Sequence, residues 1–378
     1  YSDRLDRELL MTSGYLRGSS NLLAGASGQG GGYTIENSLR FRGAYPATPS
    51  YLSRTAGTPT NNLKWTFSCW VKRGVLGVAQ NLLNGGPGIS AYEDYFAFFG
   101  SDKISFGQEN ASSTYILTAS VYRDPSAWYH LMFVYDSAQA TASNRALFYV
   151  NGVQLTSFTN ATYPTLNKAS TINASGKLQR ISSRTYAATE GLDGYLTEVN
   201  FIDGQALTPS SFGEYNATTG VWQPAKYEGT YGNNGFYLNF SDNTTTSTLA
   251  EDSSGNGNDW TPSNISLTAG VTYDSMTDTP TPYADGGNYA VLNPIDQNTS
   301  ATLSDANLKA TATGGSQAAH GSIYIPTSGK YYFETFWNSV ASSNTYVGLG
   351  GNTNYRASGA IYVEGVNVAT GASYGAGT

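Results

Sequence analysis

Three segments in the first half of the chain constrain its fold more than any other feature, because each combines aromatic and β-branched residues with turn signals at its ends. They are 65–72 (WTFSCWVK), 128–136 (WYHLMFVYD) and 145–153 (RALFYVNGV). Runs of this length and composition are typical of β-strands. The sequence therefore predicts an antiparallel, all-β core built around these three segments.

The overall composition agrees with a β-sheet protein that has many turns. The 378 residues include 43 Gly and 29 Tyr, and charged residues make up 12 % of the chain. A typical globular protein has about 25 % charged residues, and disordered chains have high charge with few aromatic residues. The surface of this protein is therefore expected to be made of hydroxyl and amide groups.

Net charge and the length of apolar runs argue against two classes of partner, nucleic acids and membranes. The formal net charge is −7, whereas a nucleic-acid-binding protein needs a concentrated basic surface. No run of the sequence approaches 18 consecutive apolar residues, so we expect no insertion into a membrane.

The chain divides by composition into four parts. Residues 1–34 are predicted to form an anchor arm, in which Leu5, Leu9 and Leu10 have helical spacing, followed by a Gly-rich linker. A poorly ordered terminus is the alternative for this part. Residues 35–262 form the main β-sandwich, 263–284 a Thr/Pro-rich connector, and 285–378 the start of a second β-sandwich. The second β-pattern stops at the end of the sequence, so we expect the chain to continue in a longer polypeptide.

The three strand segments resemble the laminin-G-like domains of the concanavalin-A-like sandwich (jelly-roll) family. A further strand at 194–203 (GYLTEVNFID) and the following segment 206–215, in which Pro209 suits the first position of a short helix, are similar to the end of such domains. The turn at 252–258 (DSSGNGN) normally occurs near the start of these domains, which suggests a rearranged strand order. This fold hosts binding, structural and catalytic proteins.

Two further resemblances concern the rest of the chain and its origin. Segments 329–334 (GKYYFE) and 346–350 (YVGLG) resemble the opening strands of SPRY-type sandwiches. Segments 124–130 (DPSAWYH), 201–207 (FIDGQAL) and 256–260 (NGNDW) resemble laminin-G-like modules in structural proteins of marine tailed bacteriophages. This second resemblance implies a virion protein, part of a tail fibre or appendage.

Residues that often carry out catalysis are sparse. The single cysteine, Cys69, shares a predicted strand face with Trp65 and Phe67, so we expect a small buried residue. His130 lies in a predicted strand and is expected to be packed, and His320 is the only other histidine. No nucleophile-elbow motif accompanies them, and clustered His/Cys ligands for zinc are absent from the sequence.

Polysaccharide hydrolysis is the enzymatic activity that this fold class makes worth testing. Concanavalin-A-like glucanases place acids on one strand in an E-x-D-x-x-E pattern, and hydrolysis needs two carboxylates beside the bond. The nearest match runs from Glu198 to Asp203. It has the neutral Asn200 in the middle and ends on Asp at a different offset, so we predict no enzymatic activity.

Calcium is the one metal for which the sequence offers a candidate site. Asp252, Asn256, Asn258 and Asp259 supply oxygen ligands within one loop, and Gly255 and Gly257 allow tight backbone turns. An ordinary turn is the alternative, because Asn-Gly and Ser-Gly pairs are common turn residues. No other cofactor is predicted.

The leading hypothesis is a non-enzymatic phage virion protein that attaches to glycans of the host cell surface. The arm would bind other virion proteins, and fibre proteins of this kind are expected to form homo-oligomers. Aromatic residues expected in loops or at strand ends are candidates for glycan contact: Tyr92, Tyr95, Tyr122, Tyr186, Trp222, Tyr227 and Tyr231. The alternative is a purely structural virion protein, in a capsid decoration or in tail assembly, and a polysaccharide depolymerase is third.

Overall fold

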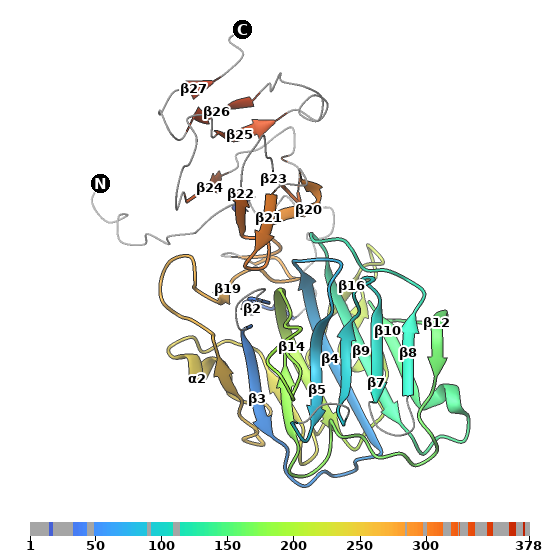
Figure 1. Ribbon diagram of the computed structural model, residues 1–378. Coiled ribbons are helices and arrows are strands. Elements are labelled where there is room, and N and C mark those ends of the chain that lie inside the picture. The colour runs from blue at the N-terminus through green and yellow to red at the C-terminus, as the bar shows by residue number, and fades with distance from the viewer. Residues whose placement is uncertain are drawn as a thin grey trace.

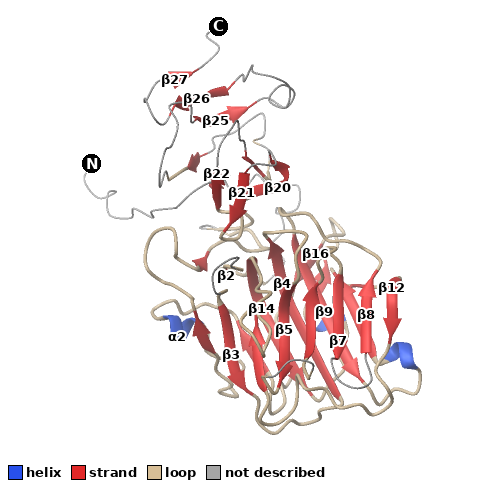
Figure 2. Cartoon of the chain, viewed as in Figure 1, coloured by secondary structure: helices blue, strands red, loops and turns tan. Residues whose placement is uncertain are grey.

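The computed structural model describes most of the first 297 residues and shorter segments after them. The described residues are 15–17, 33–43, 49–88, 92–108, 114–283, 286–297, 301–312, 319–323, 325, 332–336, 346–350, 363–367 and 373–374. Strands make up nearly all of the regular structure, and the helices are single turns at its edges (Figure 2). The expected all-β class is therefore confirmed.

Two eight-stranded antiparallel sheets lie face to face and form the main sandwich (Figure 1). Sheet I has the order β11 (Val153–Gln154), β10 (Ala146–Val150), β9 (Trp128–Asp136), β4 (Lys64–Arg73), β14 (Gly194–Asp203), β2 (Ser38–Phe41) and β19 (Ser275–Met276), with β17 (Phe236–Leu238) also paired to β14. Sheet II has the order β12 (Phe158–Thr162), β8 (Thr114–Thr118), β7 (Ile104–Gln108), β6 (Asp94–Phe98), β5 (Gln80–Gly86), β13 (Leu178–Ile181), β3 (Tyr51–Thr55) and β18 (Thr261–Ser263). The predicted strands 65–72, 128–136 and 194–203 are adjacent in sheet I.

The core lies between the sheets and is dominated by aromatic rings. Trp65, Phe67, Cys69 and Val71 of β4 are all buried and face sheet II, as the alternation predicts. The Trp65 ring lies 5.3 Å from the Phe133 ring, and Phe133 stacks on Phe106 of sheet II at 4.4 Å. Burying such a side chain contributes about 1.5–3 kcal/mol, so these contacts hold the two sheets together.

The outer face of sheet I is covered by two later segments of the chain. One begins after β14 and includes the 3₁₀ turn η2 (Pro209–Ser211), β15 (Gly213–Tyr215) and β16 (Trp222–Pro224). From this segment Phe212 packs on Met132, Val134 and Ile202 of the sheet. The turn at η2 agrees with the short helix expected at Pro209.

The second covering segment runs from residue 274 to residue 308. Asp274 accepts hydrogen bonds from the buried Arg40 and from Arg42, and Asp278 pairs with the buried Lys72 of β4. Val291 and Leu308 pack with Trp70 and other rings of this face. Part of the segment predicted as a connector therefore packs tightly on the main sandwich.

The remaining elements are small. Two 3₁₀ or α-helical turns, η1 (Ala142–Asn144) and α2 (Thr246–Leu249), lie at the edges. Two hairpin-like pairs follow the sandwich: β20 (Leu292–Gln297) with β23 (Ala319–Gly321), and β21 (Ala301–Ser304) with β22 (Lys309–Ala312). The last strands are β24 (Tyr332–Glu334), β25 (Tyr346–Gly350), β26 (Val363–Asn367) and β27 (Ser373–Tyr374).

Strands do form at two of the positions that resemble a SPRY-type sandwich, β24 and β25. The predicted helix around Leu5, Leu9 and Leu10 lies outside the described residues. After it, Tyr15–Arg17 forms β1, which pairs with β24. Among the helices that the structure describes, none is long and apolar enough to cross a membrane.

Candidate functional site

Sheet II has one face turned to the core and an outer face turned away from it. Residues that lie opposite one another on neighbouring strands form rows across the sheet. One such row is apolar and points into the core: Leu52, Ile181, Leu83, Phe96, Phe106 and Ile116. Their neighbours in sequence point outward, because side chains alternate along a strand. These neighbours form a second row across all eight strands, which we call the outer row: Thr261, Ser53, Arg180, Asn84, Tyr95, Gly107, Tyr115 and Thr162.

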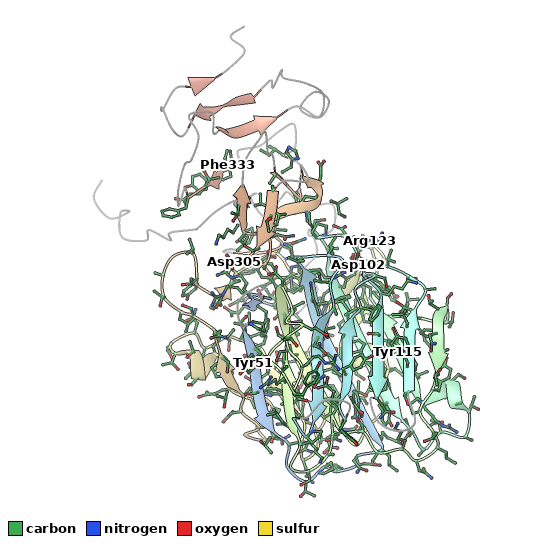
Figure 3. All side chains as sticks on the ribbon, viewed as in Figure 1. Tyr51, Asp102, Tyr115, Arg123, Asp305 and Phe333 are labelled. Atoms are coloured by element: carbon green, nitrogen blue, oxygen red, sulfur yellow. The ribbon has the colours of Figure 1, made fainter. Side chains whose placement is uncertain are left out.

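A tyrosine ring lies flat across the middle of the outer row. A Cβ atom placed on Gly107 would lie 2.4 Å from the ring of Tyr95, so the ring covers the space where a side chain would otherwise project. Tyr95 and Tyr115 are both half-buried, and Tyr115 makes an edge contact with the exposed Phe99. Figure 3 labels Tyr51 and Tyr115 on two separate strands, β3 and β8, of this sheet.

Arg180 places a cationic group in the same row. Its guanidinium lies 4.5 Å from the ring centre of Tyr51, and its Nη1 donates to the carbonyl oxygen of Arg184 at 2.6 Å. Its Nε has no hydrogen-bond partner in the described part of the chain. Within that part no carboxylate forms an ion pair with Arg180.

The loop between β13 and β14 folds back over one edge of this face and adds aromatic and charged groups. Arg184 donates to Glu93 and lies 3.5 Å from a carboxylate oxygen of Glu190. Its guanidinium lies 4.7 Å from the ring of Tyr186 and 5.9 Å from that of Tyr95. The loop therefore brings Tyr186, whose side chain is exposed, next to the outer row.

Buried polar contacts fix this loop in place. The hydroxyl and amide of Thr185 both donate to Glu93, at 2.8 and 3.2 Å, and the amide also donates to Asn84 at 3.0 Å. The side-chain amide of Asn81 donates to Glu190 at 3.2 Å. Glu93, Asn81 and Asn84 are almost completely buried, so the loop is held by hydrogen bonds that water does not compete for.

The seven aromatic candidates fall into two groups. Tyr95 and Tyr186 meet beside Arg184, and Tyr92, which is 55 % exposed, directly precedes Glu93. The other four serve packing: Tyr122 is buried, Trp222 covers Gly152, and Tyr227 and Tyr231 pack in the cluster around Phe212. The sequence offered no means of placing Arg180 and Arg184 beside Tyr51 and Tyr95, because those tyrosines come from a different part of the chain.

The four predicted calcium ligands lie together in one loop, where they make internal hydrogen bonds. Asp252 accepts from the amides of Tyr237, Ser254 and Asn258 at 2.8–2.9 Å, and Asp259 accepts from the amide of Asp252. The side-chain nitrogens of Asn256 and Asn258 donate to carbonyl oxygens, both reaching that of Gly235. These contacts are those of a tight turn, and calcium binding here stays a prediction.

The two carboxylates at the ends of the glucanase-like segment are engaged in separate structural contacts. Glu198 lies at a β-bulge with φ of 50°, is 6 % exposed, and accepts hydrogen bonds from the hydroxyls of Tyr33 and Tyr237. Burial raises its pKa to about 7. Asp203 accepts from the amides of Thr60, Asn61 and Asn234 and from the side chain of Asn173. Neither belongs to the outer row of sheet II.

His130 and Cys69 are buried, as expected. Trp222 donates to Nδ1 of His130 at 3.1 Å, so the proton of the neutral ring is on Nε2, which donates to Ser68 at 2.8 Å. Burial lowers the pKa of His130 to about 3, and a ring in this tautomer does not accept a proton from Ser68. Burial also raises the pKa of Cys69 well above its usual range, so its thiol is not ionised.

Two further findings concern metal binding and the second histidine among the described residues. In these parts of the chain no three His, Cys, Asp or Glu side chains group in a way that could hold a metal ion. His320 lies next to Asp296, far along the chain from His130 and the outer row.

Comparison with known proteins supports the fold of the sandwich. Residues 47–211 match the Laminin_G_3 family model, described as the concanavalin A-like lectin/glucanases superfamily. The chain therefore contains a concanavalin A-like domain. No curated protein matches the chain.

Several solved structures are similar at low sequence identity. A heptameric SAP-like pentraxin from Limulus polyphemus is 15 % identical over 47 % of this chain and 80 % of its own, with a TM-score of 0.34. A putative carbohydrate-binding protein from Bacteroides ovatus is 13 % identical over 62 % of this chain and 60 % of its own, with a TM-score of 0.38. The CBM40 of a Ruminococcus gnavus IT-sialidase, bound to α2,3-sialyllactose, is 9 % identical over 39 % of this chain and 86 % of its own, with a TM-score of 0.29.

Proposed function

We propose that this protein is a non-enzymatic glycan-binding component of a phage virion, and that the outer row of sheet II with its adjoining loop holds the glycan. The observation that carries the proposal is the grouping of Tyr95, Tyr186, Arg180 and Arg184 at the outer row of sheet II and its adjoining loop. The family match supports it, since that superfamily includes lectins.

The chemistry of these groups suits a sugar. A sugar ring has an apolar side of C–H groups that packs on a flat aromatic ring, and hydroxyl groups at its edge that need hydrogen-bond partners. Tyr95 offers the aromatic ring, and the neighbouring guanidinium groups offer donors. Because β-strands and a hydrogen-bonded loop hold these side chains, little conformational freedom is lost on binding.

The carboxylates beside this face favour binding over hydrolysis. A glycosidase needs one protonated acid and one free carboxylate on either side of the scissile bond. Here Glu93 is buried and accepts from Arg184 and Thr185, and Glu190 is paired with Asn81 and Arg184. Both carboxylates therefore have a structural role in holding the loop.

The virion assignment rests on the sequence segments that resemble marine phage proteins. In this proposal the sandwich faces the host cell, and the N-terminal arm of residues 1–34 binds other virion proteins. The location is then the extracellular phage particle.

The test is binding of the labelled full-length chain to candidate host cells, with host polysaccharide as competitor. We expect saturable binding that the polysaccharide abolishes. Tyr95→Ala should weaken it about tenfold or more, the loss that one aromatic anchor typically causes at the centre of an interface. Tyr215→Ala, an exposed tyrosine on the side of sheet I, is the matched control and should leave binding unchanged.

The same experiment separates the other hypotheses. Attachment to stripped phage particles without binding to any susceptible host would make the chain a purely structural virion protein. Shortening of the polysaccharide would make it a depolymerase. Loss of binding in chelator, restored by calcium, would show that binding requires calcium and would point to the Asp252–Asp259 loop as its site.

A further inference from the structure

A buried lysine lies between an aspartate and an asparagine on the outer face of sheet I. Nζ of Lys72 donates to Oδ2 of Asp278 at 2.8 Å, to Oδ1 of Asn288 at 2.8 Å and to the carbonyl oxygen of Tyr289 at 2.5 Å. Lys72 comes from β4, and its three partners come from the second covering segment, more than 200 residues later. The amine of Lys72 is thus hydrogen-bonded to an oxygen of a carboxyl group and to the oxygen of a carboxamide.

Aromatic side chains surround this triad and keep water from most of it. Trp70, Trp128, Tyr195 and Tyr289 form the local cluster, and the side chains of Lys72 and Asp278 have no exposed surface. Nε1 of Trp128 donates to the second oxygen of Asp278 at 3.0 Å and fixes the orientation of the carboxyl group. Asn288 is half-buried, and its Nδ2 donates to the carbonyl oxygen of Ser126 at 2.7 Å.

Burial favours the uncharged forms of the lysine and the aspartate. Desolvation lowers the pKa of Lys72 and raises that of Asp278, while the attraction between the two groups acts in the opposite direction. Transfer of one proton from Nζ to Asp278 converts the ion pair into a neutral amine and a carboxylic acid. A neutral amine is a nucleophile, and a carboxylic acid can protonate the group that it attacks.

We propose that Lys72 and Asn288 form an intramolecular isopeptide bond, with Asp278 as the acid–base group. After proton transfer to Asp278, rotation about Cε–Nζ directs the amine lone pair at Cγ of Asn288. The acid of Asp278 stabilises the charge that develops on Oδ1 of Asn288 and relays one proton from Nζ to Nδ2. The Nζ–Cγ bond forms, the Cγ–Nδ2 bond breaks, and Nδ2 leaves as ammonia.

The reaction balances without a further reactant. The ammonium group of Lys72 and the carboxamide of Asn288 give one secondary amide, and the departing ammonia also carries off, as ammonium, the proton that Asp278 first took from Nζ, which returns Asp278 to its starting carboxylate. Ammonia can leave because Asn288 is half-exposed. The product would tie the second covering segment to β4 by a covalent bond, which does not depend on the proposed glycan site.

Mass spectrometry of the full-length purified chain tests this directly. The intact mass should be lower than the sequence mass by about 17 Da, the mass of one ammonia. Trypsin should release a branched product in which residues 65–73 are joined to residues 227–309, because cleavage after the acylated Lys72 is blocked. The branch should map to Lys72 and Asn288 on fragmentation.

Two variants and a control make the result specific. Asn288→Ala removes the attacked carbon but keeps the contact between Lys72 and Asp278, and Lys72→Met removes the nucleophile. Both should have the full sequence mass and release two separate peptides. Asn216→Ala, another half-buried asparagine, should keep the branched peptide.

Three results would overturn the proposal. The first is an unchanged intact mass for the folded wild-type chain. The second is a loss of about 17 Da that persists in Asn288→Ala, which would indicate ring closure at an Asn-Gly pair such as Asn256-Gly257 instead. The third is a loss of about 18 Da with a branch at Asp278, which would mean that the carboxyl group is attacked and water leaves.

Discussion

Glu198 shows how one residue can take a position that its sequence context does not reveal. In the segment GYLTEVNFID it has the appearance of an ordinary polar strand residue. The structure places it at a bulge with positive φ, where two tyrosine hydroxyls donate to its carboxylate. A bulge adds one residue to one strand and re-aims its side chain, which local alternation does not predict.

The raised pKa of Glu198 gives a prediction for stability against pH. The folded chain holds this proton up to pH about 7, whereas the unfolded chain releases it at its ordinary value of 4.5. The folded state therefore binds more protons between these values, and the contribution of Glu198 to stability falls as the pH rises from 4.5 to 7. A pKa shift from 4.5 to about 7 changes the free energy of unfolding by about 3 kcal/mol in total.

Glu198→Gln should remove this component, because a carboxamide does not titrate. Chemical denaturation at pH 4.5, 6 and 8 would measure the free energy of unfolding of both proteins. The stability of the variant relative to the wild type should increase from pH 4.5 to pH 8. Parallel curves for the two proteins would show that Glu198 does not titrate in this range.

At the scale of an element, β7 is shaped to support Tyr95 on the neighbouring strand. Gly107→Ala should displace the Tyr95 ring, because the new Cβ would lie 2.4 Å from it. If Tyr95 contacts the glycan, cell binding should fall by about the tenfold expected for Tyr95→Ala. Ser105→Ala, on the same strand and the same face, is the control. Equal binding by both variants would place the ligand away from Tyr95.

How far the sequence predicts each element depends on whether its signal is local. The strands around Trp65, Trp128 and Phe201 were predicted because aromatic and β-branched residues alternate there. The strands of sheet II from β5 to β8 were not identified, since β5 and β7 contain glycines and polar residues that weaken that pattern, and β6 and β8 have only five residues each. The contacts of Arg180 with Tyr51, and of Lys72 with Asp278, join residues that are far apart in sequence, so no local pattern indicates them.

The calcium hypothesis shows the same limit within a single loop. The sequence placed Asp252, Asn256, Asn258 and Asp259 together, and they do lie together. Whether their oxygens are free for a cation depends on the backbone amides that face them, and in the structure several amides donate to Asp252. The spacing of ligand residues alone does not distinguish a metal loop from a turn.

At the scale of the whole molecule, the second covering segment joins distant parts of the chain into one body. Asp274 is the centre of this junction, since it binds Arg40, Arg42 and the amide of Ser266. The hairpin of β21 and β22 adds to the junction: Asp305 lies at its tip (Figure 3), and the next residue, Ala306, donates its amide to Asp193 and accepts from Tyr195.

Asp274→Ala should destabilise the protein by about 3–5 kcal/mol, because it removes the buried carboxylate that pairs with Arg40 and Arg42. Urea denaturation followed by tryptophan fluorescence would measure the loss. Glu251→Ala, on the exposed surface, should change stability by about 0.5 kcal/mol or less. Similar values for the two variants would mean that residues after 262 contribute little to the sandwich.

The chain enters and leaves the sandwich at neighbouring points. The amide of Ile35 donates to Thr281, whose hydroxyl donates back to the carbonyl oxygen of Ile35. Figure 1 shows the strands after β19 gathered at this end. A pulling force applied through residues 33 and 291 would therefore act first on the short contact between these two segments. The two sheets lie outside the line of tension, so we expect them to stay folded when this contact is pulled apart.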